Sequence, residues 1–246
     1  MTHTRIKILN APVDTVTMRQ TVAQVGRWMV STDPDRLYQI CTVNPEFVMR
    51  AQDDQAFLEV LNRADLCLAD GIGLVYASRY QGHPVPERVP GSELVYHLAE
   101  ACAQNQWRLF LLGAADGVAA EAGEILQDKY PNLDIVGTWP GSPDPAENDE
   151  IIEKINAAAA DMLYVAYGAP NQDKWIARNR ENLKTVRVAM GIGGSLDFIT
   201  GRSIRAPQWI QSIGLEWLHR LWMEPWRWRR MLTLPKFAFR VLFSAK

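Results

Sequence analysis

Cysteine and histidine are scarce in this chain, which has three cysteines and four histidines among 246 residues. Cys41, Cys67 and Cys102 are odd in number and scattered, so they form neither a disulfide framework nor a CxxC metal site. The histidines do not cluster, and no close pair of acids has the spacing of metal ligands. We therefore expect a reducing compartment and no bound metal.

Long apolar runs are also missing. No stretch approaches the roughly 18 apolar residues that a membrane-spanning helix needs. The first residues, MTHTRIKILNAP, lack the apolar core of a signal peptide, so we expect a cytoplasmic location. The hydrophobic share of 48% is ordinary, and the length fits one large α/β domain or one domain plus an appendage.

Short apolar, strand-like runs alternate with helical patterns along the chain. The strand-like runs are residues 6–9, 13–15, 38–43, 66–68, 109–112, 135–138, 162–166 and 186–190. Strands that alternate with helices are typical of parallel sheets, because each connection must cross back over the sheet. We predict an α/β fold, with a mostly parallel, Rossmann-like sheet and helices on both faces.

Asp70 stands between a predicted strand and a predicted helix, in the segment Leu66-Cys67-Leu68-Ala69-Asp70-Gly71-Ile72-Gly73. Open α/β sheets bind ligands at the carboxyl ends of their strands, so this carboxylate is a candidate catalytic base. Aspartate is also a favoured helix N-cap. The position alone leaves both interpretations open.

Parallel topology predicts that the other strand-to-helix loops meet at the same edge of the sheet. Polar or glycine-rich residues of these loops are Thr42 with Asn44, Gly113, Trp139, Gln172, and Gly191 to Gly194. Glycine-rich turns at helix starts bind phosphate through backbone amides, although a glycine after a strand is often just a tight turn. Arg88 follows in a long loop, where it either binds a phosphate or lies in solvent.

The carboxyl-terminal segment differs from the rest of the chain. From Arg205 onward it has eight basic and two acidic residues, against 18 basic and 26 acidic before it, and it holds five of the nine tryptophans. We therefore predict a domain over residues 1–204 and an appendage over residues 205–246. Tryptophan and basic residues around a short amphipathic helix favour a membrane surface over a helix docked on the core. The acidic body argues against nucleic acid.

Six groups of motifs occur in one order along almost the whole chain. They are Thr42-Val43-Asn44-Pro45-Glu46; Ala69-Asp70-Gly71-Ile72-Gly73; Pro86-Glu87-Arg88-Val89 with Gly91-Ser92; Gly168-Ala169-Pro170 with Gln172 and Lys174-Trp175-Ile176; Gly191 to Gly194 with Asp197 and Gly201; and Arg205-Ala206-Pro207, Trp209, Gly214-Leu215-Glu216-Trp217, Arg220-Leu221 and Glu224-Pro225. Together they resemble the WecG/TagA/CpsF family of bacterial glycosyltransferases (glycosyltransferase family 26). Asn171 and Asp173 depart from this pattern, where lysine and glutamate are common.

The resemblance implies an inverting, metal-independent enzyme with no cofactor. It implies transfer of N-acetylmannosamine, its uronic acid or a glucose-type sugar from a UDP-sugar to a polyprenyl-diphosphate-linked saccharide. The enzyme would act in cell-wall or exopolysaccharide synthesis, as a peripheral protein on the cytoplasmic face of the membrane. Whether it forms a homo-oligomer stays open.

The resemblance also assigns roles to residues. Asp70 would be the general base, and Thr42, Asn44, Arg88 and Gln172 would line the substrate pocket. The nucleotide and diphosphate would be bound by Gly191, Gly193, Gly194, Asp197, Arg220, Arg227 and Arg230.

Two other functions are considered beside this one. An NAD-type oxidoreductase would need a GxGxxG turn with an acid about 20 residues later, and the sequence has no such pair. A non-enzymatic peripheral membrane module would explain the basic, tryptophan-rich segment. It would not explain the polar residues at the strand ends.

Overall fold

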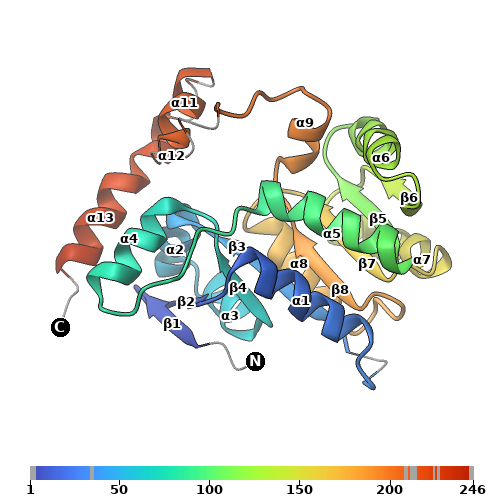
Figure 1. Ribbon diagram of the computed structural model, residues 1–246, viewed down its shortest axis with the longest axis horizontal. Coiled ribbons are helices and arrows are strands. Elements are labelled where there is room, and N and C mark those ends of the chain that lie inside the picture. The colour runs from blue at the N-terminus through green and yellow to red at the C-terminus, as the bar shows by residue number, and fades with distance from the viewer. Residues whose placement is uncertain are drawn as a thin grey trace.

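The computed structural model of the chain describes residues 4–33, 36–207, 210, 215–223, 225 and 228–243. Six parallel strands form a central sheet in the order β4-β3-β8-β7-β5-β6 (Figure 1). They are β3 (Tyr38–Val43), β4 (Leu66–Ala69), β5 (Arg108–Gly113), β6 (Asp134–Trp139), β7 (Met162–Ala166) and β8 (Val188–Gly191). The predicted α/β fold with a parallel sheet is confirmed.

Helices pack on both faces of this sheet. One face carries α1 (Met18–Met29), α5 (Gly91–Asn105), α6 (Val118–Lys129) and α9 (Ser195–Ile199). The other carries α2 (Pro45–Asp53), α3 (Gln55–Arg63), α7 (Asn148–Ala157) and α8 (Asn171–Asn179), with the short turn η1 (Pro145–Glu147) before α7. Helix α4 (Ile72–Tyr80) follows β4, and the residue before its start approaches the start of α2 closely.

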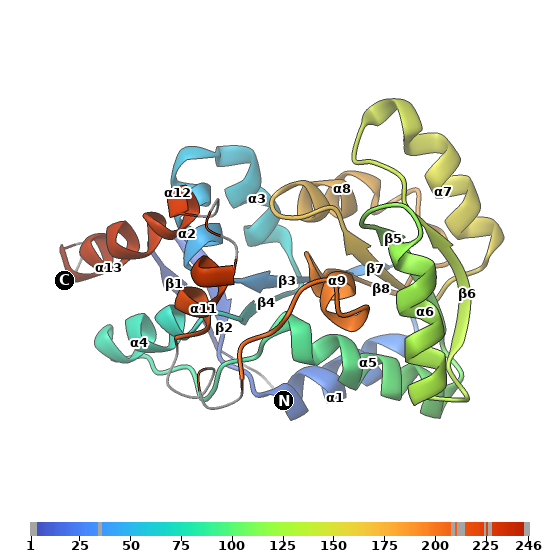
Figure 2. The ribbon, with the colours of Figure 1, turned by 90° about the horizontal axis from the view of Figure 1, so that it is seen from above.

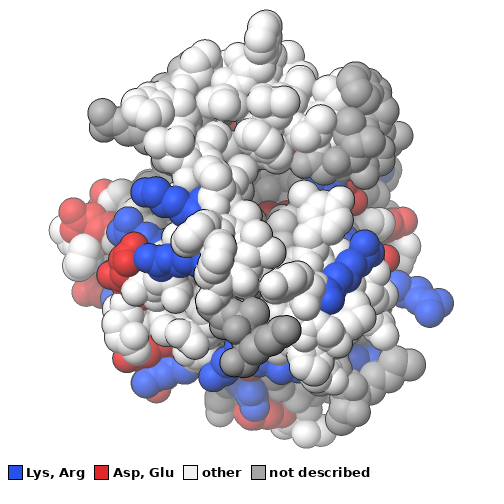
Figure 3. Space-filling view, turned by 90° about the vertical axis from the view of Figure 1, so that its left-hand side faces the viewer, with Lys and Arg blue, Asp and Glu red and all other residues white. Residues whose placement is uncertain are grey.

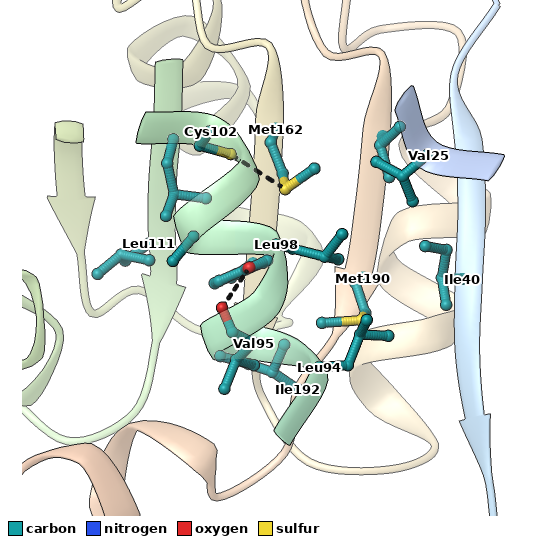
Figure 4. Packing of buried hydrophobic residues seen from close by; sticks show 14 of the residues in the cluster. Val25, Ile40, Leu94, Val95, Leu98, Cys102, Leu111, Met162, Met190 and Ile192 are labelled. Atoms are coloured by element: carbon teal, nitrogen blue, oxygen red, sulfur yellow. Dashed lines mark hydrogen bonds between the residues drawn. The ribbon is translucent and has the colours of Figure 1, made fainter. Parts of the chain in front are cut away.

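The core is split by the sheet because successive strand residues point to opposite faces. Ile40 packs with Val25 and Leu98 on the face of α1 and α5, as Figure 4 shows, whereas Cys41 belongs to the cluster under α2 and α3. The hydroxyl of Tyr164, buried on the same face as Ile40, donates a hydrogen bond of 2.9 Å to a backbone carbonyl of α5. Burial on both faces explains why the strands are apolar throughout.

A small antiparallel pair protects the edge of the sheet. Strands β1 (Arg5–Ile8) and β2 (Ala11–Asp14) are joined by Leu9 and Asn10, both with positive φ, as two-residue hairpins require. Asp14 accepts the amide of Cys67 on the edge strand β4 at 2.7 Å and pairs with Arg5 at 2.8 Å. This carboxylate therefore satisfies a donor that an edge strand would otherwise leave exposed.

The carboxyl-terminal segment contains α11 (Glu216–Met223), α12 (Trp228–Met231) and α13 (Thr233–Phe243). Helix α13 lies along α2 and α4 (Figures 1 and 2), and its Phe237 and Val241 are buried in the cluster that includes Phe47. Within the residues that the structure describes, no helix is both long enough and apolar enough to cross a membrane.

Candidate active site

A cleft of about 1140 Å³ opens at the carboxyl ends of β3, β4, β7 and β8. Open α/β folds bind their ligands at this carboxyl edge of the sheet. The cleft brings together most of the residues expected from the sequence, namely Thr42, Asn44, Asp70, Arg88, Gln172, Gly193, Gly194 and Asp197. Residues far apart in sequence therefore share one solvent-filled space.

Asp70 does not cap the helix that follows it. The N-cap of α4 is Gly71, which makes no side-chain cap bond. Instead, Oδ1 of Asp70 accepts the backbone amide of Gly91 at 3.2 Å, across 21 residues of sequence. A Cβ at Gly91 would lie 2.8 Å from Cγ2 of Thr42, so only glycine fits between them. Asp70 is therefore not the N-cap of α4; its carboxylate bonds the first amide of α5 (Gly91–Asn105) and forms part of the cleft wall.

Asn44 has the structural role that its position suggests. Its side chain accepts the amide of Phe47 at 3.0 Å and caps α2, and Pro45 occupies the first turn. The start of α2 touches the start of α4, since a Cβ at Gly71 would lie 2.5 Å from Cδ of Pro45. The two helices therefore begin side by side at the cleft.

Gln172 ties α8 to the turn after β8. It is 2% exposed, and its Oε1 accepts the amide of Gly193 at 2.9 Å. A Cβ at Gly191 would lie 2.5 Å from its Nε2, so this glycine makes room for the glutamine. Thr42 donates a weaker bond of 3.4 Å to the carbonyl of Gly191. Gly191 itself lies beneath the cleft and is not among the described residues that line it.

Arg88 is held by a network that reaches into the carboxyl-terminal segment. Its Nη1 donates to Oε2 of Glu216 at 3.0 Å, although 128 residues separate the two. Arg205 contacts Glu216 at 3.4 Å and Glu93 at 2.7 Å. Burial acts to lower the pKa of Arg205, but the two carboxylates outweigh it and raise that pKa. Sequence analysis gave no role to Glu216, because no local pattern signals so distant an ion pair.

A second carboxylate lies beneath the cleft. Asp173 is fully buried, and this burial raises its pKa to about 7, although the thiol of Cys41 and the side chain of Gln172 act in the opposite direction. The buried cysteine lies on β3, in register with Cys67 on β4. Asp173 is therefore a buried carboxylic acid that keeps its proton up to a pH of about 7.

Two residues expected at the site lie elsewhere. Trp139 ends β6 at the far edge of the sheet, where the Lys154 ammonium stands 4.1 Å from its ring. Gly113 has φ of 99°, and a Cβ there would lie 2.9 Å from the backbone of Ala166. Glycine at this turn thus allows β5 and β7 to lie close together. Neither residue is among the described residues of the cleft wall. The expectation that all strand-end loops converge is wrong for these two.

Three expected arginines are not placed. Arg227 lies outside the described residues, and so do the side chains of Arg220 and Arg230. Across the described ranges, no group of three His, Cys, Asp or Glu side chains is arranged to hold a metal ion.

Several lining residues were not foreseen. Ile72, Tyr76 and Tyr80 extend the cleft along α4, opposite residues of α13. Their four-residue spacing was visible in the sequence, but the partner helix was not. The wall thus has a polar part at the strand ends and an apolar part between two helices.

An open parallel sheet with a polar cleft at its strand ends defines an α/β ligand-binding domain of the kind that many enzymes use. The sequence profile of the "Glycosyl transferase WecG/TagA/CpsF family" matches residues 6–246. The chain belongs to this family. It is therefore placed among glycosyl transferases rather than oxidoreductases.

Curated relatives support the same placement. Two proteins, from Bacillus subtilis (strain 168) and Bacillus spizizenii, are 36% and 39% identical over 84% and 82% of this chain, and over 80% and 78% of their own lengths. A third, from Staphylococcus aureus (strain MW2), is 32% identical over 96% of this chain and 92% of its own. Each is named N-acetylglucosaminyldiphosphoundecaprenol N-acetyl-beta-D-mannosaminyltransferase.

Proposed function

We propose that this protein transfers a sugar from a UDP-sugar to a polyprenyl-diphosphate-linked saccharide, with inversion and without a metal ion, in cell-wall or exopolysaccharide synthesis. One observation carries the proposal: a single cleft holds the carboxylate of Asp70, the guanidinium of Arg88 and the glycine turn at residues 193–194. The relatives' names favour N-acetylmannosamine as the sugar and an N-acetylglucosamine-bearing lipid diphosphate as the acceptor.

Asp70 is proposed as the general base. Its carboxylate takes the proton of the acceptor hydroxyl while that oxygen attacks the anomeric carbon and the bond to UDP breaks. The amide of Gly91 bonds to one carboxylate oxygen and thereby fixes the orientation of the side chain. A nucleotide donor with an α-glycosidic bond gives a β product only by inversion, which matches the β-linkage in the relatives' names.

Negative charge develops on the departing diphosphate, and cations and oriented amides are proposed to stabilise it. Arg88 donates to Glu216 from Nη1, and its Nη2 stands 3.9 Å from Glu93, while a guanidinium carries five N–H donors. The same group can therefore also bind a diphosphate oxygen. Gly193 and Gly194 are proposed to contact the diphosphate, with Asp197 beside the nucleotide. Arg220, Arg227 and Arg230 are proposed to supply further positive charge.

Residues 205–246 are proposed to act as an appendage that binds the cytoplasmic face of the membrane. Apolar side chains of this segment face solvent, among them Trp222, Phe239 and Phe243 at 84%, 61% and 73% exposure. Such side chains next to arginine suit the interface of an anionic bilayer. Docking there would bring the cleft to its lipid-linked acceptor.

A UDP-release assay tests the proposed reaction. Several UDP-sugars are offered with a soluble acceptor that carries N-acetylglucosamine on a short prenyl diphosphate, and the anomeric configuration of the product is read by NMR. We expect release with UDP-N-acetylmannosamine only when the acceptor is present, and a β product. Release that does not depend on the acceptor, or an α product, would contradict the proposal.

A further inference from the structure

The apolar part of the cleft lies between two helices. Helix α4 lines it with Ile72, Tyr76 and Tyr80, and α13 lines it with Leu234, Ala238 and Leu242. Both sets repeat every four residues, so each forms one stripe along its helix. Eight residues of helix at 1.5 Å each make this space about 12 Å long.

The stripe on α13 stands next to a buried one. Phe237 and Val241 are anchored in the core, and Phe237 lies 3.6 Å from where a Cβ of Gly73 would be. The two stripes meet at one end, where the hydroxyl of Tyr80 donates to the carbonyl of Leu242 at 3.5 Å. Their side chains still face solvent, since Tyr76, Tyr80 and Leu242 are 57%, 54% and 52% exposed. Anchoring therefore fixes α13 beside α4, and the groove is bounded at the end of Tyr80 and Leu242.

Charge is distributed unevenly along the cleft. Its described charged residues are Glu46, Asp70, Arg88, Asp197 and Glu216. Asp70 follows β4, Arg88 lies in the loop between α4 and α5, and the other three belong to α2, α9 and α11. The α4 and α13 stripes contribute none. Figure 3 views this end of the molecule, whose centre and upper part consist mainly of uncharged residues. The cleft is therefore amphipathic, with Asp70 two residues before the first member of the α4 stripe.

We propose that the groove between α4 and α13 binds the first isoprene units of the acceptor's lipid chain. This inference rests on the proposed function, which supplies a ligand with a sugar and a diphosphate at one end and a hydrocarbon at the other. The groove is continuous with the site of transfer, so one molecule can place its sugar at Asp70 and its hydrocarbon between the helices. Burial of the prenyl chain there adds affinity that grows with chain length.

Calorimetry without donor and without vesicles tests the groove. The probes are N-acetylglucosamine diphosphate lipids with a single isoprene unit and with a short run of them. The wild-type protein should bind the longer lipid at least about tenfold more tightly, the scale of burying about two methylene groups. Ala238→Trp fills the groove from an exposed position and should abolish the difference in affinity between the two lipids.

Two further variants keep the result interpretable. Phe239→Trp adds the same indole one residue away, at a position that is exposed and not among the described cleft residues, and it should behave as wild type. Tyr76→Ser removes apolar surface from the opposite wall and should weaken binding of the longer lipid without adding bulk. Circular dichroism checks that each variant folds.

Each outcome decides between the proposals. Equal affinity for both lipids in the wild type, or equal behaviour of Ala238→Trp and Phe239→Trp, overturns the groove. A preference that appears only with vesicles assigns this face to the bilayer surface and also overturns it. Chain-length-dependent binding without any UDP release would leave the groove standing and reject the transferase reaction.

Discussion

The two halves of the sheet's carboxyl edge have the same topology but different contents. The cleft half, at the ends of β4, β3, β8 and β7, buries the polar side chains of Thr42, Gln172 and Asp173. In the outer half, made of β5, β6, α6 and α7, none of the described polar side chains is buried. Buried polar groups cost stability. Their concentration on one side indicates that this side is shaped for a ligand, while the other side serves as scaffold.

The two halves also differ in the helices that cover them. Helices α11 and α13 lie over the cleft half, and Glu216 links α11 to Arg88 there. In the outer half, α6 instead contacts the turn after α9 through the exposed Arg202–Glu121 pair. A strand end in a parallel sheet is thus not enough for a site; polar side chains and a covering segment are needed as well.

The largest difference in kcat is expected between the substitutions of two aspartates, one in each half. Asp70→Asn keeps an oxygen for the amide of Gly91 but removes the base, so kcat should fall by roughly two to four orders of magnitude. Asp116→Asn changes an exposed acid after β5, in the outer half, and should leave kcat unchanged. Steady-state UDP release measures both. Similar rates for the two variants would remove Asp70 from the mechanism.

Asp173 should make the cleft half sensitive to pH. Its pKa is about 7 when folded and 3.8 as the ordinary value, so the folded state holds a proton that the unfolded state has lost. The stability it contributes is full below pH 3.8 and is lost as the pH rises through 7. Between about pH 5 and about pH 8 the loss is roughly 3 kcal/mol.

Urea denaturation of the wild type and Asp173→Asn measures this loss. The amide stays neutral, so the variant should lack that part of the pH dependence; other titrating groups cancel in the comparison. Asp116→Asn controls for removal of a carboxylate and should follow the wild type. A variant with the same pH dependence as the wild type would show that Asp173 is ionised in the folded protein.

Arg88→Lys compares cations in the two halves. The variant keeps the charge but loses the planar fork that binds phosphate at two points, so kcat/KM should fall roughly ten- to hundredfold. Arg202→Lys, in an exposed ion pair with Glu121, should have no measurable effect. If both variants retain full activity, Arg88 does not bind the diphosphate.

Two glycines should separate function from stability. Gly113→Ala strains a turn in the outer half, where φ is 99°, and should cost about 1–3 kcal/mol of stability while the folded enzyme keeps its rate. Gly191→Ala pushes on Gln172 and breaks its bond to Gly193, so KM for the donor should rise roughly three- to tenfold. Thermal melts and donor titrations of both variants check this. A raised KM in Gly113→Ala together with a loss of stability alone in Gly191→Ala would contradict the roles assigned to the two halves.

Local signals predicted the elements well. The predicted strand-like runs 38–43 and 162–166 are β3 and β7. These features depend on neighbours a few residues apart, which the sequence shows directly. The parallel α/β class followed from their alternation.

Long-range contacts set the limits of prediction. The bond from Gly91 to Asp70 and the ion pair from Arg88 to Glu216 join distant segments, so the sequence left the role of Asp70 open and gave none to Glu216. The strand order was equally hidden, and it alone separates Trp139 from the cleft. The family motifs pointed to residues that meet in one cleft, but not to the contacts that hold them.

Hydrogen–deuterium exchange with and without UDP tests the central claim, that the ligand binds in one half of the edge. We predict protection of the amides at residues 191–195 and at Gly91, and none at residues 113–118, the corresponding turn of the outer half. Protection of residues 113–118 with no change at residues 191–195 would contradict the account.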